Sequence, residues 1–236
     1  IGTSNTCVGD GTLQFATTST FNTCIGSGAG LVGSMSSGYN TLLGATSGQS
    51  VAGANNTGAG YQTLMYVTTG THNTALGSDA LKGNSVSKLT GSHNSGIGYQ
   101  TGYSLTTGSY NVLSGYQAGY SLTTGGYNVM NGYKAGYTLT SGSDNVLLGN
   151  LAGEHTTTAS GNVCLGQYAG RFLTGARNIV MGYEAGKNIT GADNLYLGYQ
   201  AGDNAQGGIK KVHIGYQAGR TDTASNKLHI ANNSTE

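Results

Sequence analysis

The chain has no proline, no tryptophan and few charged residues, which make up only 8% of its 236 positions. Its formal net charge is +1, whereas a protein that binds nucleic acid through phosphates needs a basic stripe, so we expect no nucleic-acid partner. The chain also lacks any apolar run of about 18 residues, the length that a transmembrane helix requires, so we expect no membrane insertion.

Recognisable catalytic motifs are missing as well. The nine acidic residues form no pair at a fixed repeat position, and the chain has no Ser/His/Asp set, no HExxH motif and no phosphate loop before a helix. A calcium-binding RTX solenoid is excluded, because it needs an aspartate in each repeat. We therefore predict no enzyme, no cofactor and no metal site. The chain has five histidines, and we expect no two of them to share a position in the repeat that the next paragraph describes. They are His72, His93, His155, His213 and His229.

What the chain has instead is glycine, 43 residues of it, much of it in a fixed phase. The stretch 111–125 reads NVLSGYQAGYSLTTG and returns one period later, at 128–142, as NVMNGYKAGYTLTSG. In almost every copy an asparagine is followed four residues later by a glycine, here called the phase glycine. A second glycine usually follows after four more residues. Such a strict repeat indicates one repetitive domain rather than a disordered chain. The phase glycines, about 17 residues apart, are Gly9, Gly26, Gly44, Gly60, Gly77, Gly98, Gly115, Gly132, Gly149, Gly166, Gly182, Gly198 and Gly215.

Each copy also carries a short apolar run between the asparagine and the phase glycine, as at 146–148 and 163–165. Short apolar runs bounded by turn residues predict strands. Glycine at two fixed places in each repeat argues against a helix, since each one costs about 1 kcal/mol there. We therefore predict an all-β fold over residues 1–219, a parallel β-solenoid (β-roll) of about 13 coils. Each coil is expected to hold two short strands, stacked in parallel on those of the next coil.

The apolar runs further predict an oligomer. Because side chains alternate across a strand, we expect the first and third residues of each run to face the inside and the central residue to face outward. The central residues are nevertheless apolar, which is typical of a sheet buried on both faces. A thin coil has no second layer, so we expect them to pack at the axis of a homotrimer, intertwined or side by side. They are Cys7, Cys24, Leu42, Leu113, Met130, Leu147, Cys164, Val180, Tyr196 and His213.

One of these central residues raises the question of a metal. Three copies of His213 would meet at the axis of a trimer, and three imidazoles suffice to bind a metal or an anion. No carboxylate that would orient the ring stands next to it in the sequence. We therefore expect neutral imidazoles and no bound metal.

The three cysteines lie two residues after a repeat asparagine, at Cys7, Cys24 and Cys164. An odd number does not make a disulfide framework, and their shared position predicts small buried apolar groups. Cys7 and Cys24 are one repeat apart, so a bridge between them stays open. The strict geometry of a disulfide argues against it.

Tyrosine forms a column directly after the phase glycine. Stacked rings would hold the coils in register with their hydroxyl groups in water, and the alternative is a face that binds sugars. Repeated threonines at 106–107, 123–124 and 140 leave an ice-binding face as a further alternative, although the threonine column breaks at Phe172 and Ile189. The tyrosines are Tyr61, Tyr99, Tyr116, Tyr133, Tyr183, Tyr199 and Tyr216.

Residues 220–236 leave the phase of the repeat. We expect them to form an exit or cap segment with one short strand at 227–231, leading to a further domain outside this sequence. Glycosylation sequons, which would mark surface loops if the source glycosylates, occur at Asn55, Asn188, Asn232 and Asn233.

Several motifs resemble those of known fibrous proteins. NTALG (73–77), GYQAG (115–119, 198–202 and 215–219) and SLTTG (104–108) resemble repeats of phage tail-fibre and bacterial surface-adhesin proteins. They also resemble the shorter-period head repeats of trimeric autotransporter adhesins, which form a trimeric left-handed parallel β-roll. SNKLHIANNS (225–234) is similar to the link that precedes a C-terminal intramolecular chaperone in such proteins.

The resemblance and the composition together predict a non-enzymatic, extracellular trimeric fibre shaft or head, on a cell surface or a virion. Its partners would be other copies of the chain and a cell-surface glycan. An alternative is a structural subunit of an extracellular filament that assembles end to end. An ice- or glycan-binding solenoid is a further alternative.

Overall fold

The computed structural model describes residues 2–15, 18–31 and 38–232. The chain divides into two units, Ile1–Thr124 and Gly125–Glu236. Among the described residues the first unit holds β1 (Thr6–Val8), β2 (Thr23–Ile25), β3 (Thr41–Leu43), β4 (Thr57–Ala59), β5 (Thr74–Leu76), β6 (Ser95–Ile97) and β7 (Val112–Ser114). The second unit holds β8 (Val129–Asn131), β9 (Val146–Leu148), β10 (Val163–Leu165), β11 (Ile179–Met181), β12 (Leu195–Leu197), β13 (Val212–Gly215) and β14 (Leu228–Ala231).

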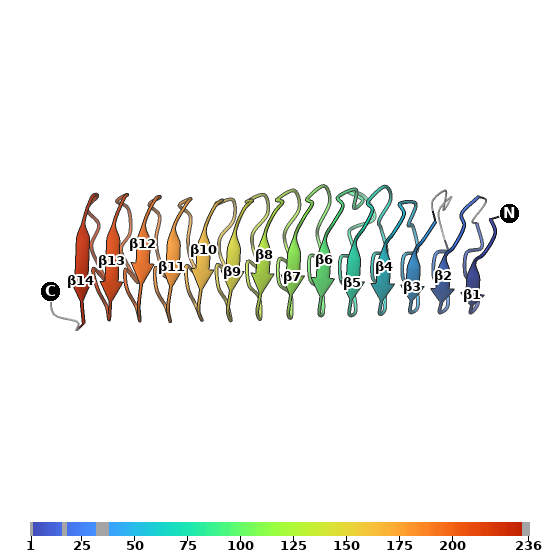
Figure 1. The fold of residues 1–236 in the computed structure, drawn as a ribbon, viewed down its shortest axis with the longest axis horizontal. Coiled ribbons are helices and arrows are strands. Elements are labelled where there is room, and N and C mark those ends of the chain that lie inside the picture. Colours follow the sequence, from blue (N-terminus) through green and yellow to red (C-terminus); the bar gives the residue numbers. More distant parts are fainter. Residues whose placement is uncertain (1, 16–17, 32–37, 233–236) are drawn as a thin grey trace. The chain divides into compact units, whose positions relative to one another are not determined.

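Within each unit the strands lie side by side in chain order and pair in parallel (Figure 1). The register matches like positions of the repeat: Leu147 pairs with Cys164, and Cys164 pairs with Val180. The predicted all-β parallel solenoid, with one turn about every 17 residues, is therefore confirmed.

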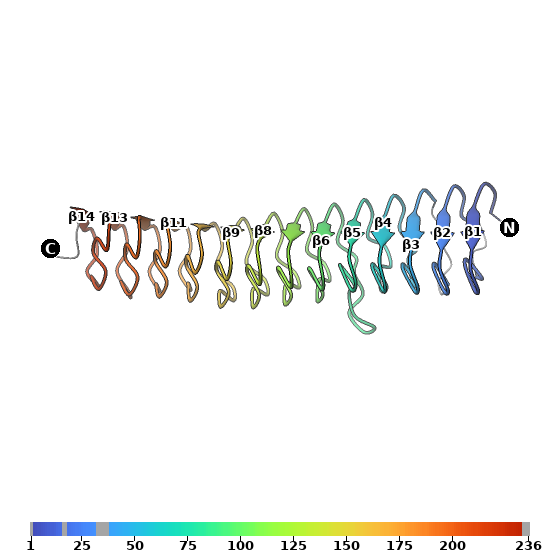
Figure 2. The same cartoon turned by 90° about the horizontal axis from the view of Figure 1, so that it is seen from below.

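Among the residues that the structure describes, each coil contains one strand instead of the two that we expected. Figure 2 shows the strands along one side of the coils and turns along the other. Left-handed residues recur in these turns, for example Lys134 with φ 51° and Gly136 with φ 60°, so the chain there cannot adopt β dihedrals. Backbone hydrogen bonds still join successive coils, as from Gly153 N to Ala169 O at 3.0 Å. In the described ranges, the turns contribute one isolated β-bridge, between Val67 and Leu89.

The strands face the opposite way from our expectation. The central residue points into the coil of its own chain: Leu147 is 1% exposed and Tyr196 is fully buried. The first and third residues point outward, and Val112 is 49% exposed. The placement of the central residues at a trimer axis is therefore wrong for Cys24, Leu42, Leu113, Met130, Leu147, Cys164, Val180, Tyr196 and His213, which lie in the interior of a single chain. Cys7, in β1, is exposed.

The reason lies in the asparagine that directly precedes each of the strands β2 to β12. It is buried in the coil, and residues two apart along a strand share a face, so the central residue must be buried with it. Strands such as Val146–Leu148 are apolar at every position, which left no amphipathic pattern from which to choose the inward face.

Two turn positions complete the interior. They are the alanine before the second glycine and the residue seven positions after the phase glycine. In the coil of β8, Met130, Ala135 and Leu139 are all fully buried. In the coil of β12 the large Tyr196 accompanies a small residue, Ala205, where the coils of β8 and β10 have Leu139 and Leu173. Large and small side chains thus compensate within one coil, as close packing requires.

The second glycine makes room for the central side chain. Gly153 has φ +58°, and a Cβ built on it would lie 2.9 Å from Cδ1 of Leu147. The same position in the preceding coil, Gly136, would place a Cβ 2.6 Å from Sδ of Met130. The second glycine is thus required by backbone conformation and by packing together.

Replacing Gly153 by alanine should therefore cost about 1–3 kcal/mol of unfolding free energy, from left-handed strain plus the forced movement of Leu147. Gly161→Ala is the matched control. Gly161 has φ +71°, but the nearest atom to its added Cβ is Cγ of Arg177 at 3.3 Å. Urea denaturation should show the larger loss for Gly153→Ala, and equal losses would contradict the packing role.

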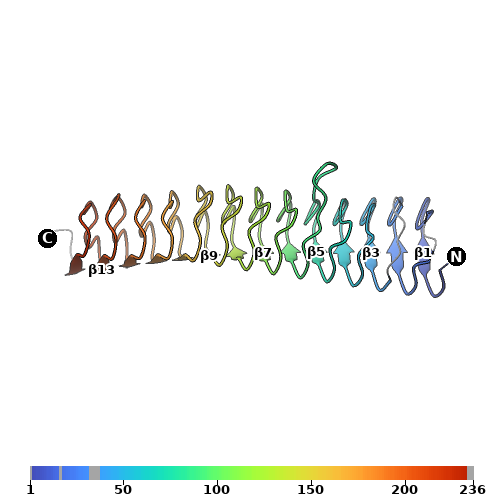
Figure 3. The ribbon, with the colours of Figure 1, turned by 90° about the horizontal axis from the view of Figure 1, so that it is seen from above.

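Two segments depart from the regular coil. The insertion after β5 projects beyond the neighbouring turns (Figure 3), and Val86 on it is 89% exposed. In the segment 220–236, β14 pairs in parallel with β13 and matches His229 to His213. The expected short strand is thus present, and it continues the solenoid by one more strand.

Candidate functional site

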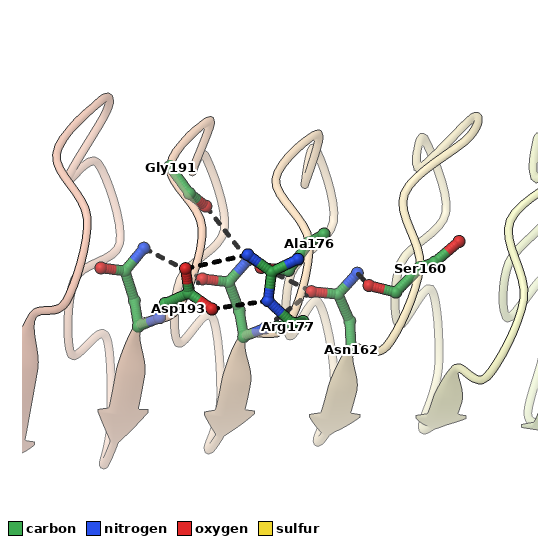
Figure 4. A network of polar contacts seen from close by, with 8 residues as sticks. Ser160, Asn162, Ala176, Arg177, Gly191 and Asp193 are labelled. Atoms are coloured by element: carbon green, nitrogen blue, oxygen red, sulfur yellow. Dashed lines mark hydrogen bonds and ion pairs between the residues drawn. The ribbon is translucent and has the colours of Figure 1, made fainter.

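A ladder of buried asparagines runs through the interior of each unit. The Oδ1 atom of Asn162 accepts hydrogen bonds from the backbone N of Asn178 at 2.9 Å and from its Nδ2 at 3.1 Å. Nδ2 of Asn178 also donates to Gly191 O at 3.1 Å (Figure 4). Because every buried amide atom is paired within the ladder, the asparagine column stabilises the fold and leaves no group for a ligand.

The ladder ends at Lys211, which stands where the other copies have asparagine. The side chain is fully buried. Its Nζ donates to the carbonyl oxygens of Ala205 at 3.2 Å and Asp222 at 2.6 Å, and its backbone N donates to Oδ1 of Asn194 at 3.0 Å. Burial lowers the pKa of Lys211, and the carboxylate of Asp222 opposes that effect.

The tyrosine column is exposed, as a surface ladder requires. Its seven members are 41–53% exposed. Rings stack in two runs, Tyr99 on Tyr116 at 5.3 Å between centroids, and Tyr183 on Tyr199 at 5.5 Å. Tyr199 stacks in turn on Tyr216 at 5.1 Å. The column is interrupted by Ser78, Asn150 and Gln167, so it offers short aromatic strips rather than one continuous face.

A second aromatic column, which the sequence analysis missed, precedes the repeat asparagine. His93 stacks between His72 at 4.8 Å and Tyr110 at 4.9 Å, and Phe21 stacks on Tyr39 at 5.2 Å. The members of this column have φ near +60°. The expectation that no two histidines share a repeat position is wrong, because His72 and His93 share this one. Aligning the copies on the phase glycine would have revealed the column.

In the second unit the same column carries charge. Arg177 forms a bidentate ion pair with Asp193, at 2.7 Å and 3.0 Å (Figure 4). Both side chains are solvent-accessible, and such pairs contribute little to stability. The column thus differs between the two units in the chemistry that it presents to a partner.

An outward stripe of uncharged side chains is formed by the first and third residues of the strands; the first residue is threonine or serine in β1 to β6 and valine, isoleucine or leucine in β7 to β14. None of these positions in the described strands carries a charge. The sequence analysis had placed these side chains inside. Large members that stay at least 37% exposed are Val8, Ile25, Leu43, Leu76, Ile97 and Val112 in the first unit, and Val129, Ile179, Leu197, Leu228 and Ile230 in the second.

The most unusual polar cluster lies between β13 and β14. Nε2 of His229 is 3.0 Å from Oδ2 of Asp222, and Nε2 of the fully buried His213 is 3.5 Å from the same oxygen. Burial, and then the neighbouring charge of His229, lower the pKa of His213 to about 4. Burial acts to raise the pKa of Asp222, but hydrogen bonds from Ala224 N and His229 outweigh this effect, so the pKa lies below its usual value. The sequence analysis found no carboxylate beside His213. Asp222 of the same chain is that carboxylate.

The cysteines are all free. Burial raises the pKa of Cys24 to about 12, with a smaller effect of Cys7, and burial alone does the same for Cys164. Both thiols therefore stay protonated at neutral pH and cannot act as nucleophiles.

The sequons fall on accessible turns. Asn55 and Asn232 are exposed and Asn188 is half-buried. Asn233 lies outside the described residues. In the part of the chain that the structure covers, no helix has the length and apolar character needed to cross a membrane.

Comparison with protein-family models, curated proteins and solved structures found no match to this chain.

Proposed function

We propose that the chain forms a non-enzymatic, extracellular homotrimer, the shaft or head of a fibre on a virion or a bacterial surface, and that it serves in attachment. The observation that carries the proposal is the outward stripe. It presents two uncharged columns, the first and the third residues of the strands, along each unit. Large apolar side chains recur along this stripe in both units, and extended exposed apolar surfaces mark interfaces.

Further copies of the same chain are the occupants that fit this stripe best. Its side chains recur with the spacing of paired strands, about 4.8 Å, and only an equally periodic surface matches that spacing over many strands. The two columns let one chain contact two neighbours, one through each column. Contacts of this head-to-tail kind generate a closed ring when the rotation between neighbours closes, and a ring of three is the smallest such assembly. The motif resemblance to trimeric adhesin heads supports three copies over two.

The experiment is sedimentation of the whole chain at micromolar concentration, where we expect the mass of a trimer. Ile179→Asp places a charge in the stripe at a position that is 44% exposed in one chain. It should weaken association at least about a hundredfold, through desolvation and like-charge repulsion, and leave a folded monomer. Val86→Asp is the control, because Val86 is an exposed apolar residue on the insertion, away from the stripe. A wild-type monomer, or a trimer that Ile179→Asp leaves intact, would contradict the proposal. Large polymers in the sedimentation experiment would instead support the alternative, a filament subunit that assembles end to end.

A cell-surface glycan is the proposed target, and the exposed aromatic columns support it. Flat rings such as Tyr199 and Tyr216, stacked 5.1 Å apart, offer the faces on which sugar rings pack. Because three chains bring three copies of each strip together, weak single contacts would add to a stronger overall attachment.

A further inference from the structure

The interior changes its chemistry at the end of the second unit. The central strand position and the position seven residues after the phase glycine are both buried in the coils of β10, β11 and β12. In the coils of β10, β11 and β12 they hold Cys164 with Leu173, Val180 with Ile189, and Tyr196 with Ala205. In the coil of β13 the same two positions hold His213 and Asp222, and the central position of β14 holds His229. Three potential ligands thus replace apolar core residues.

The three donor atoms are placed as a metal ion would need them. The Asp222 Oδ2 atom is 3.0 Å from Nε2 of His229 and 3.5 Å from Nε2 of His213. All three lie within 4.8 Å of one another. Ligands at about 2.0–2.1 Å from a tetrahedral zinc ion are separated by roughly 3.3 Å, so modest closure of the histidine pair completes the geometry.

An unsatisfied buried group points to the same place. His213 is fully buried, yet neither of its ring nitrogens has a hydrogen-bond partner, and the hydroxyl of the adjacent Tyr196 has none either. Buried polar atoms are nearly always paired. The unpaired Nε2 atom of His213, which lies 3.5 Å from Asp222, therefore favours a bound ion at this position. Gly219 makes room for the imidazole, because a Cβ there would lie 2.3 Å from its Cε1.

We propose that His213, Asp222 and His229 bind one divalent transition-metal ion per chain, with zinc as the best fit. Two imidazoles and one carboxylate suit zinc, whereas calcium needs six to eight oxygen ligands. The ion would join β13, the turn at Asp222 and β14, and so fasten the exit segment to the last regular coil. The inference stands independently of the proposed fibre function.

The test is zinc titration of the untagged, chelator-treated whole chain by calorimetry, with cobalt(II) absorption as a second readout. We expect one zinc per chain and a cobalt spectrum of tetrahedral or five-coordinate nitrogen–oxygen ligation. Asp222→Asn and His229→Ala should each weaken zinc binding at least about tenfold, because each removes one of three ligands. Both side chains are partly exposed, and circular dichroism verifies that the variants fold.

His72→Ala is the control, since His72 lies in the exposed aromatic column of the first unit, and its zinc affinity should equal that of the wild type. Hydrogen exchange should slow at Leu228–Ala231 when zinc is added. The proposal is overturned if zinc fails to bind below about 100 μM, a concentration at which weak surface histidines begin to bind metals. It is equally overturned if Asp222→Asn and His229→Ala both bind zinc as the wild type does, or if only His72→Ala loses binding.

Discussion

Replacing Asn145 by alanine is expected to lower the free energy of unfolding of the second unit by about 3–5 kcal/mol, since each buried group left without a partner costs about 1–3 kcal/mol. Oδ1 of Asn145 accepts from the backbone N of Asn162 at 3.0 Å and from its Nδ2 at 3.2 Å. Its own Nδ2 donates to Asn128 Oδ1 at 3.0 Å and to Ala159 O at 2.9 Å. Alanine removes all four hydrogen bonds and leaves their partner atoms unpaired in the interior.

The measurement is urea denaturation followed by far-UV circular dichroism. Asn150→Ala, the same substitution on an exposed residue of the same coil, provides the control and should change stability by less than about 0.5 kcal/mol. Equal effects of the two substitutions would show that the ladder does not stabilise the fold.

Leu147→Asp is expected to unfold the second unit outright, at a cost of about 4 kcal/mol or more, because a carboxylate would enter the dry interior without a partner. Leu147 is 1% exposed within a single chain. The loss should therefore be the same at every protein concentration. If Leu147 instead lay at an axis between chains, the variant would be a folded monomer in dilute solution.

Val129→Asp separates these two outcomes. Val129 lies on the neighbouring strand, faces outward and is 37% exposed, so its replacement should leave a dilute monomer folded, with a loss below about 1 kcal/mol. A Leu147→Asp chain that keeps its circular dichroism spectrum would refute the inward placement of the central residues.

The positions of the strands and turns follow from the sequence alone. The apolar runs between each asparagine and its phase glycine predicted β9 and β10 at their observed residues. The reason is local: Gly166 has φ +130°, a conformation that side chains other than glycine rarely adopt, and a Cβ there would lie 2.6 Å from the carbonyl oxygen of Gly182. A glycine in strict phase therefore fixes where each coil turns and how it stacks.

The facing of the strands was decided only by the tertiary structure. A run such as 146–148 is apolar at every position, so it carries no alternation that distinguishes inside from outside. What selects the inward face is the closure of the coil, which buries Asn145 in a continuous ladder and Leu147 with it.

The grouping of His213, Asp222 and His229 also depends on the winding of the chain. No spacing typical of a metal site joins them in the sequence. The winding of one coil brings the half-buried Asp222 to within 3.5 Å of His213, and the parallel register of β13 and β14 sets His229 beside His213. None of these contacts can be predicted from the sequence by itself, because they arise from stacking one coil on the next. Stacking brings residues about one period apart to the spacing of paired strands.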